Sequence, residues 1–330
     1  MNVHLPKANE MQKFQFTAAD DRFHFSTMSD RWWETETCWF SFSIPERKFG
    51  GWIYVLARPN IGTVAGGAWF WDDSGELPWE VLHCANYTTM RLPRDQDLDD
   101  IRLPTGVSIK MIETLARYDV GYDYEDSVQL KMRFDAVIPP QPLTNVKTAY
   151  AHLSHFDQIG HVTGKLLLHG ETLTIDCYAM RDRSWGPRPE YRAIPSAYVS
   201  AMAGSGHGLL AVTDPAISGD PVTHGFLLRD GEVRPLAQGH RRVERDPGNN
   251  RVMRIVLDAE DDRGRKVFAT GTSQSRIIIN RHSFIDSMSL VRWDLNGEEA
   301  WGEDQDLWPY ERWARRLRRL RRSFRDDSGS

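Results

Sequence analysis

Short runs in which apolar and polar positions alternate make up most of the chain. In the first half, Thr35–Ile44, Gly51–Ala57 and Ala65–Trp71 are rich in aromatic and β-branched residues, which is typical of strands. Thr172–Ala179 and Arg251–Asp258 repeat this pattern in the second half, and glycine-containing turns separate many of the runs. Because long helical periodicities are scarce, the pattern predicts an all-β protein built from antiparallel barrels or sandwiches.

Two segments interrupt the alternation. Asp99–Arg117 is an internal segment that we expect to form a helix. Residues 139–142 read Pro-Pro-Gln-Pro, and such a run can hold neither a helix nor a strand ladder. We therefore predict two β domains packed together, an N-terminal domain over residues 1–140 and a C-terminal domain over residues 141–310.

Residues 311–330 differ in composition from the rest of the chain. They contain eight arginines against three acidic residues, whereas the whole chain has a net charge of −5, which leaves −10 for residues 1–310. So acidic a body would repel a polyphosphate backbone, and we expect no binding of nucleic acid. The tail also carries one apolar stripe at helical spacing, formed by Trp313, Leu317, Leu320 and Phe324. It is predicted to be a basic amphipathic helix, either solvated or in peripheral contact with an anionic membrane surface or a partner.

Composition and motifs exclude several classes of protein. The chain of 330 residues is 40% hydrophobic, which is enough for a substantial core. It contains no run of the roughly 18 apolar residues that a membrane helix needs, and its start lacks the layout of a secretory signal, so we expect a cytoplasmic protein. The three cysteines lie far apart and match no zinc or disulfide spacing. Because P-loop, HExxH and CxxC motifs are also lacking, we predict neither a metal nor a cofactor.

The densest group of charged residues is the string Arg-Asp-Arg-Ser-Trp-Gly-Pro-Arg that begins at Arg181, directly after an apolar strand. Two interpretations of this string compete. In the structural one, Asp182 forms a buried ion pair with Arg181 or Arg188, and Trp185 fills the core. In the functional one, Asp182 and a neighbouring histidine form an acid–base pair at the mouth of an apolar pocket, where burial raises the pKa of a carboxyl group.

A second candidate pair lies just upstream. His155 and Asp157 are two residues apart in a predicted strand, so their side chains point to the same face. Both side chains could therefore enter one cavity. The alternative is that they are ordinary buried residues with a structural role.

His155-Phe156-Asp157-Gln158 and the string from Arg181 to Arg188 resemble the carotenoid 1,2-hydratase (hydroxyneurosporene synthase)-like superfamily. The resemblance implies two lipocalin-like antiparallel β-barrel domains side by side. It also implies a hydrophobic small-molecule ligand, since relatives include hydratases of isoprenoid or phenolic double bonds, polyene cyclases and lipid-binding proteins. Arg183 stands where many members have histidine, whereas Asp182 and Trp185 match.

The sequence thus favours a cofactor-independent lyase, a hydratase, dehydratase or related acid–base enzyme, acting on a hydrophobic alkene, isoprenoid or phenolic substrate. Protonation of a C=C bond needs an acid of raised pKa, aromatic rings beside the cation, and a group that handles water. We assign these roles to Asp182 as the acid, to His155 and Asp157 as partners of water, and to Tyr178, Arg181, Trp185 and Arg188 as substrate-binding residues. The alternative is a non-catalytic carrier of lipids or terpenoids.

Overall fold

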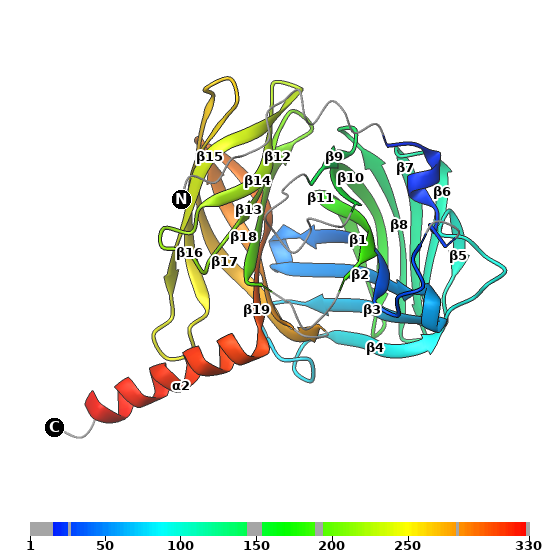
Figure 1. The fold of residues 1–330 in the computed structure, drawn as a ribbon, viewed down its shortest axis with the longest axis horizontal. Helices are drawn as coiled ribbons and strands as arrows, with labels where there is room; N and C mark the ends of the chain where they lie inside the picture. The colour runs from blue at the N-terminus through cyan, green and yellow to red at the C-terminus, as the bar shows by residue number, and fades with distance from the viewer. Residues whose placement is uncertain (1–15, 26–27, 144–153, 189–193, 282–283, 328–330) are drawn as a thin grey trace.

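The computed structural model describes residues 16–25, 28–143, 154–188, 194–281 and 284–327, without the side chains of residue 321 and residues 323–327. The described chain forms a curled sheet of eleven strands, a closed barrel of eight strands, and a C-terminal helix (Figure 1). The prediction of an all-β protein with a terminal helix is therefore confirmed.

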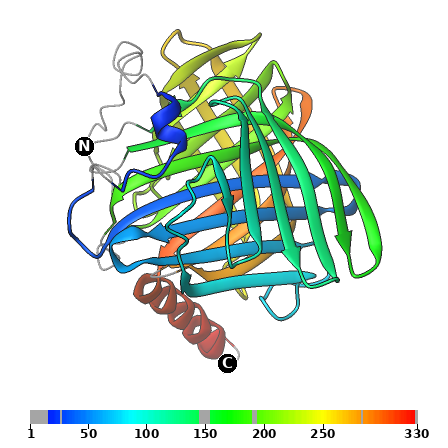
Figure 2. The ribbon, with the colours of Figure 1, turned by 90° about the vertical axis from the view of Figure 1, so that its right-hand side faces the viewer.

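The curled sheet contains every strand of the first half of the chain and two long strands beyond it. It comprises β1 (Glu34–Ile44), β2 (Phe49–Arg58), β3 (Thr63–Trp71), β4 (His83–Arg91), β5 (Asp100–Arg102), β6 (Val107–Glu113), β7 (Arg117–Tyr124), β8 (Val128–Ala136), β9 (Gln141–Pro142), β10 (Ser154–Leu168) and β11 (Glu171–Pro187). The strand order is β4-β3-β2-β1-β11-β10-β8-β7-β6-β5, with β9 paired to β10. Strands β10 and β11 therefore lie in the middle of the sheet (Figure 2).

This topology corrects the predicted domain boundary at residue 140. The prolines of residues 139–142 stop β9 after two residues, but the sheet continues, since β10 pairs with β8 from Gly160 to Leu168. The change from the curled sheet to the barrel falls between Pro187 and Ser196. A proline run breaks a strand locally, but the hydrogen-bond partners of the next strand decide which sheet it joins.

The segment Asp99–Arg117, predicted to be helical, is also different in the structure. It forms β5, β6 and the first residue of β7, joined by short turns. Ile101, Leu103 and Ile109 point into the curled sheet and are buried there. Their period-two spacing is that of a strand, and β6 pairs with β7, so the helix prediction for this segment is wrong.

The barrel is closed and its interior is filled. Its strands are β12 (Ser196–Gly204), β13 (His207–Thr213), β14 (Val222–Arg229), β15 (Glu232–Arg245), β16 (Val252–Asp261), β17 (Lys266–Arg281), β18 (Phe284–Leu295) and β19 (Glu298–Pro309). Apolar side chains such as Leu209, Leu257 and Trp293 form one buried cluster. The buried Arg241 donates to Asp304 at 2.9 and 2.8 Å and to Asp220 at 2.6 Å. The barrel interior is therefore a packed core with a buried ion-pair network.

The barrel and the curled sheet share one apolar interface. Trp39, Trp52 and Trp69 of the curled sheet belong to the same buried cluster as Phe226 and Leu307 of the barrel. The side chains of the tryptophan-rich first half are thus used to join the two sheets. This interface also contains the polar residues described below.

Helix α2 (Tyr310–Asp327) follows β19 and leaves the barrel at one end (Figure 1). Trp313 is buried against Trp308, with 6.4 Å between ring centroids. Most of the helix projects away from both sheets. No helix within the described residues is both long enough and apolar enough to cross a membrane.

Candidate functional site

Strand alternation divides the charged string on β11 between the two faces of the curled sheet. In the register with β1, Arg181 lies opposite Phe40 and Asp182 lies opposite Trp39. Phe40 belongs to the core inside the curled sheet, whereas Trp39 belongs to the interface with the barrel. Successive side chains of a strand point to opposite faces, so Arg181 lies in the core inside the curled sheet and Asp182 lies at the interface with the barrel.

Arg181 and Arg183 form buried ion pairs on the inner face. Arg181 Nη2 lies 3.0 Å from Asp21 Oδ1, and its Nε donates to Gln158 Oε1 at 2.7 Å. Arg183 pairs with Glu36, and both side chains are almost fully buried. Arg183 Nη2 also donates to the carbonyl oxygen of Arg22 at 2.7 Å. Both arginines therefore have a structural role.

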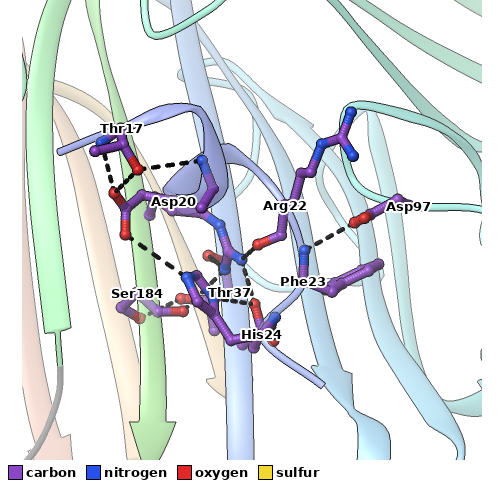
Figure 3. A network of polar contacts seen from close by, with 11 residues as sticks. Thr17, Asp20, Arg22, Phe23, His24, Thr37, Asp97 and Ser184 are labelled. Carbon is purple, nitrogen blue, oxygen red and sulfur yellow. Dashed lines mark hydrogen bonds and ion pairs between the residues drawn. The ribbon is translucent and has the colours of Figure 1, made fainter. Parts of the chain in front are cut away.

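These arginines hold an N-terminal segment, residues 16–25, against the sheet. The segment contains the short helix η1 (Ala18–Asp21), which Thr17 caps (Figure 3). His24 contacts Asp20 and stacks on Trp185, with 4.3 Å between ring centroids. Trp185 is thus enclosed by this segment on the face opposite to Asp182.

The structural interpretation of the string is therefore correct for part of it, but with other partners than predicted. Arg181 pairs with Asp21 and not with Asp182. The structure does not bring Arg181 or Trp185 to the same face as Asp182, which removes the reason for assigning them to substrate binding. Tyr178 does share the face of Asp182, but it packs against His161 and does not line the cavity described next.

A cavity of about 30 Å³ lies between the curled sheet and the barrel, where Asp182 points. It is lined by Thr37, Trp39, Trp52, Tyr54, His155, Asp182 and Arg188 from one side and by Tyr198, Arg281, Gln305 and Leu307 from the barrel. A water molecule needs about 10–15 Å³ measured in this way, so the cavity has room for about two waters. Any larger ligand requires the two walls to separate.

His155, Asp157 and Asp182 form a compact group at this cavity. Asp157 lies directly opposite Asp182 in the register of β10 and β11. His155 Nε2 lies 3.0 Å from Asp157 Oδ2, and one donor atom of each residue lies within 4.8 Å of the other two. His155 and Asp182 line the cavity, whereas Asp157 does not.

Burial and neighbouring charges change the acidity of this group. Burial raises the pKa of Asp182, the Asp157 carboxylate adds to this effect, and the cations nearby do not cancel it. Oδ1 of Asp182 is buried and has no hydrogen-bond partner among the described residues. Burial alone would lower the pKa of His155, but Asp157 and Asp182 raise it above its ordinary value. The group can therefore retain a proton at a higher pH than a free carboxyl group would.

Arg188 also reaches the cavity and is fixed there by hydroxyl groups. Its Nη2 donates to Ser184 Oγ at 2.7 Å, and Ser184 Oγ lies 2.6 Å from Thr37 Oγ1. Nε of Arg188 is buried without a hydrogen-bond partner among the described residues. A guanidinium held in this way can bind an oxygen substituent of a ligand.

The donor set of one imidazole and two carboxylates could in principle hold a metal ion. However, the charges of Arg188 and Arg281 reach Asp182 and would oppose a divalent cation. The hydrogen bond between His155 and Asp157 accounts for their separation without an ion. We keep the absence of a metal cofactor as a prediction.

The barrel contributes a wall of the cavity whose residues the sequence did not predict. Arg281, Tyr198 and Gln305 line the cavity, and two buried carboxyl groups lie on the same barrel face. Glu303 Oε1 accepts from Trp52 Nε1 at 2.8 Å, and burial raises the pKa of Glu303 to about 8. Asp286 lies 3.5 Å from Arg281, and burial raises its pKa to about 6. An acidic residue on the apolar face of a strand is the signal that could have identified them.

The pKa of Glu303 gives a prediction for stability. A carboxyl group with an ordinary pKa of 4.5 and a folded-state pKa of about 8 keeps its proton only in the folded protein between these values. The folded state is thus favoured at low pH, and the stability due to Glu303 falls as the pH rises from 4.5 to 8, by at most about 1.4 kcal/mol per unit. In urea unfolding, Glu303→Gln should reduce this pH dependence. Glu299→Gln, an exposed change on the same strand, should not; equal slopes for both variants would show that Glu303 is ionised in the folded protein.

Comparison with solved structures supports the fold. The chain is similar to a putative AttH from Nitrosomonas europaea, with 14% identity, a TM-score of 0.51, and coverage of 87% of this chain and 96% of that chain. It is similar to CghA, with 12% identity, a TM-score of 0.54, and coverage of 84% and 88%. It is also similar to kievitone hydratase from Nectria haematococca, with 12% identity, a TM-score of 0.53, and coverage of 95% and 98%.

At these identities the similarity concerns the fold alone, and it confirms the resemblance to a two-domain lipocalin-like architecture. No curated protein matches the chain in sequence. Residues 17–304 match a family described as "Domain of unknown function (DUF7064)", and this match covers the curled sheet and most of the barrel. The chain is therefore a member of the DUF7064 family.

Proposed function

We propose that the protein is an enzyme that acts on a hydrophobic small molecule in the cavity between the two sheets. More narrowly, we propose a cofactor-independent lyase that adds water to a C=C bond or removes it. The observation that carries this proposal is the position of Asp182. It is a carboxyl group of raised pKa beside His155 and among aromatic rings, with one oxygen unpartnered among the described residues.

In the proposed hydration, protonated Asp182 gives its proton to one carbon of the double bond, which leaves a cation at the other carbon. Aromatic faces stabilise such a cation, and Trp39, Trp52 and Tyr54 line the cavity. The oxygen of a water molecule then adds to the cationic carbon, and His155 accepts the proton that this water loses. His155 returns the proton to Asp182, so the reaction adds one water and restores the enzyme.

Asp157 and Arg188 have supporting roles in this scheme. Asp157 accepts a hydrogen bond from the His155 ring, which fixes the ring and favours its protonated form. Arg188 is placed to bind an oxygen substituent, such as a phenolate or hydroxyl group, at the edge of the cavity. The pairing of a cationic anchor with apolar walls suits a hydrophobic substrate that carries one polar group.

The alternative is a non-catalytic carrier of lipids or terpenoids. A carrier needs a smooth apolar cavity, whereas this cavity has His155, Asp182, Arg188 and Arg281 on its surface. Burying these groups has a cost that a pure binding function does not require. The similar folds of kievitone hydratase and of CghA, solved with Sch210972, also support an enzyme that acts on hydrophobic compounds.

The mechanism can be tested by hydration in heavy water. Purified protein is incubated with a panel of phenolic and isoprenoid alkenes, and products are analysed by mass spectrometry and NMR. We expect one solvent deuterium on the carbon next to the carbon that gains the hydroxyl group. If compounds of the panel bind to the protein but none is converted, the result would support the alternative of a non-catalytic carrier. A product without deuterium on that carbon would exclude proton transfer from Asp182.

A further inference from the structure

Helix α2 places a concentrated positive charge outside the body of the protein. Its described contacts with the barrel lie near its start, where Trp313 is buried and Arg316 Nε donates to Asn250 Oδ1 at 2.9 Å. Beyond them the helix projects from the barrel (Figure 1). Exposed arginines lie along its described part, namely Arg312, Arg315, Arg318, Arg319 and Arg322.

The helix is also amphipathic beyond its contacts with the barrel. Leu317 and Leu320 continue the line that begins at the buried Trp313, and both are partly exposed. Arginines on one side and apolar residues on the other are the composition of helices that lie in a membrane interface. A helix that was only solvated would not need this stripe beyond Trp313.

A second, separate part of the chain points to the same partner. The loop of residues 72–82, between β3 and β4, carries Trp79, whose side chain is 78% exposed. The loop is held on the barrel, since the amide of Ile278 donates to the carbonyl oxygen of Glu76 at 2.7 Å and Arg251 pairs with Glu76. A tryptophan held in water has an energetic cost that insertion between lipid headgroups removes.

The loop and the helix lie on the same side of the molecule. In Figure 1 both are at the lower edge, below β4 and the barrel, and Figure 2 shows the same after a quarter turn. The two features can therefore meet one flat surface together.

We propose that α2 and the loop of residues 72–82 form a docking surface for an anionic lipid bilayer. The arginine-rich tail has a net charge of +5, whereas residues 1–310 have −10. An anionic surface attracts the helix and repels most of the body. The loop carries four carboxylates, of which Asp73 pairs with Lys48 and Glu76 pairs with Arg251, so its attraction to the bilayer comes from Trp79 and not from charge. Duplex nucleic acid would also attract the arginines, but its bases are stacked inside the duplex and offer no apolar surface to Trp79 or to the apolar stripe. This inference goes beyond the proposed function, because docking places the cavity beside membranes, where hydrophobic compounds concentrate.

The test is co-sedimentation of the full chain with lipid vesicles, without any substrate. We expect binding to phosphatidylcholine vesicles that contain phosphatidylserine, little binding to phosphatidylcholine alone, and weaker binding as salt is added. Each arginine near an anionic surface contributes about fivefold in affinity, so R312Q/R318Q/R319Q/R322Q should weaken binding by about 10²-fold or more. Glutamine keeps the helix propensity of these positions.

Two further variants separate docking from a general effect of charge. R102Q/R117Q/R133Q/R292Q removes four exposed arginines from the body and should weaken vesicle binding far less than the α2 variant does. Trp79→Ser should weaken binding without any change in charge. Equal binding to neutral vesicles, or equal loss in both fourfold variants, would overturn the proposal. The proposal would also be overturned if the parent bound duplex RNA but not anionic vesicles, and if the α2 variant lost this RNA binding. None of these outcomes depends on whether the cavity is catalytic.

Discussion

Asp182→Asn is expected to lower turnover by about 10²–10⁴-fold, the usual contribution of a general acid, while the protein stays folded. Asparagine keeps the size of the side chain but cannot give up a proton at neutral pH. Asp182 forms no ion pair within 4 Å among the described residues, and Asp157 lies directly opposite. Burial favours the neutral form of Asp182, so a neutral amide of the same size should fit in its place, and we expect an unfolding temperature equal to that of the parent or higher.

The readouts are turnover of an alkene that the parent converts and thermal unfolding of each variant. Asp176→Asn is the matched control, since Asp176 lies on the same strand, is exposed, and forms an ion pair with His161 away from the cavity. His155→Gln should also reduce turnover strongly, because it removes the acceptor of the proton from water. A stable Asp182→Asn variant with full turnover would exclude the mechanism. A variant that loses activity and stability together would show that Asp182 is a structural residue.

Arg183→Met should destabilise the protein by about 3–5 kcal/mol, the usual effect of breaking a buried ion pair. The change leaves the carboxylate of Glu36 buried without its guanidinium partner. It also removes the donors to the carbonyl oxygens of Arg22 and Thr37, and so loosens the N-terminal segment from the sheet. Urea unfolding at neutral pH measures the loss.

Arg133→Met provides the comparison for an exposed pair. Arg133 contacts Asp119 at 2.8 Å with both side chains about half exposed, so its loss should cost no more than about 1 kcal/mol. In the double variant Arg183→Met with Glu36→Leu, no unpaired charge remains, and part of the lost stability should return. Similar small losses for Arg183→Met and Arg133→Met would mean that the buried pair does not anchor the N-terminal segment.

Several features of the protein follow from local sequence patterns. Period-two alternation in segments such as Thr35–Ile44 indicates strands, because only strands turn every second side chain to the core. The stripe from Trp313 to Phe324 indicates the helix that the structure contains. The same alternation also places His155 and Asp157 on one face, and the register with β11 adds Asp182 to that face.

Other features depend on which strand pairs with which. The sequence indicates strands but not their partners, so the proline run of residues 139–142 suggests the end of a domain, whereas β10 continues the same sheet. In the string from Arg181 to Arg188, only the neighbours of each strand face show which residues have a structural role and which can take part in chemistry. The inner face meets Asp21 and Glu36, and the outer face meets the barrel.

The wall of the cavity formed by Arg281, Gln305 and the nearby Glu303 is the part of the site that only the tertiary structure decided. These residues lie about a hundred positions or more from Asp182 along the chain, and their local pattern does not show which face of the other sheet packs against them. Their burial and the raised pKa of Glu303 arise when the outer face of the barrel packs on the tryptophans of the curled sheet. Local sequence determined the strands and their two faces, because alternation is a local property. The meeting of two faces that excludes water and creates the cavity is a long-range property, and it requires the folded chain.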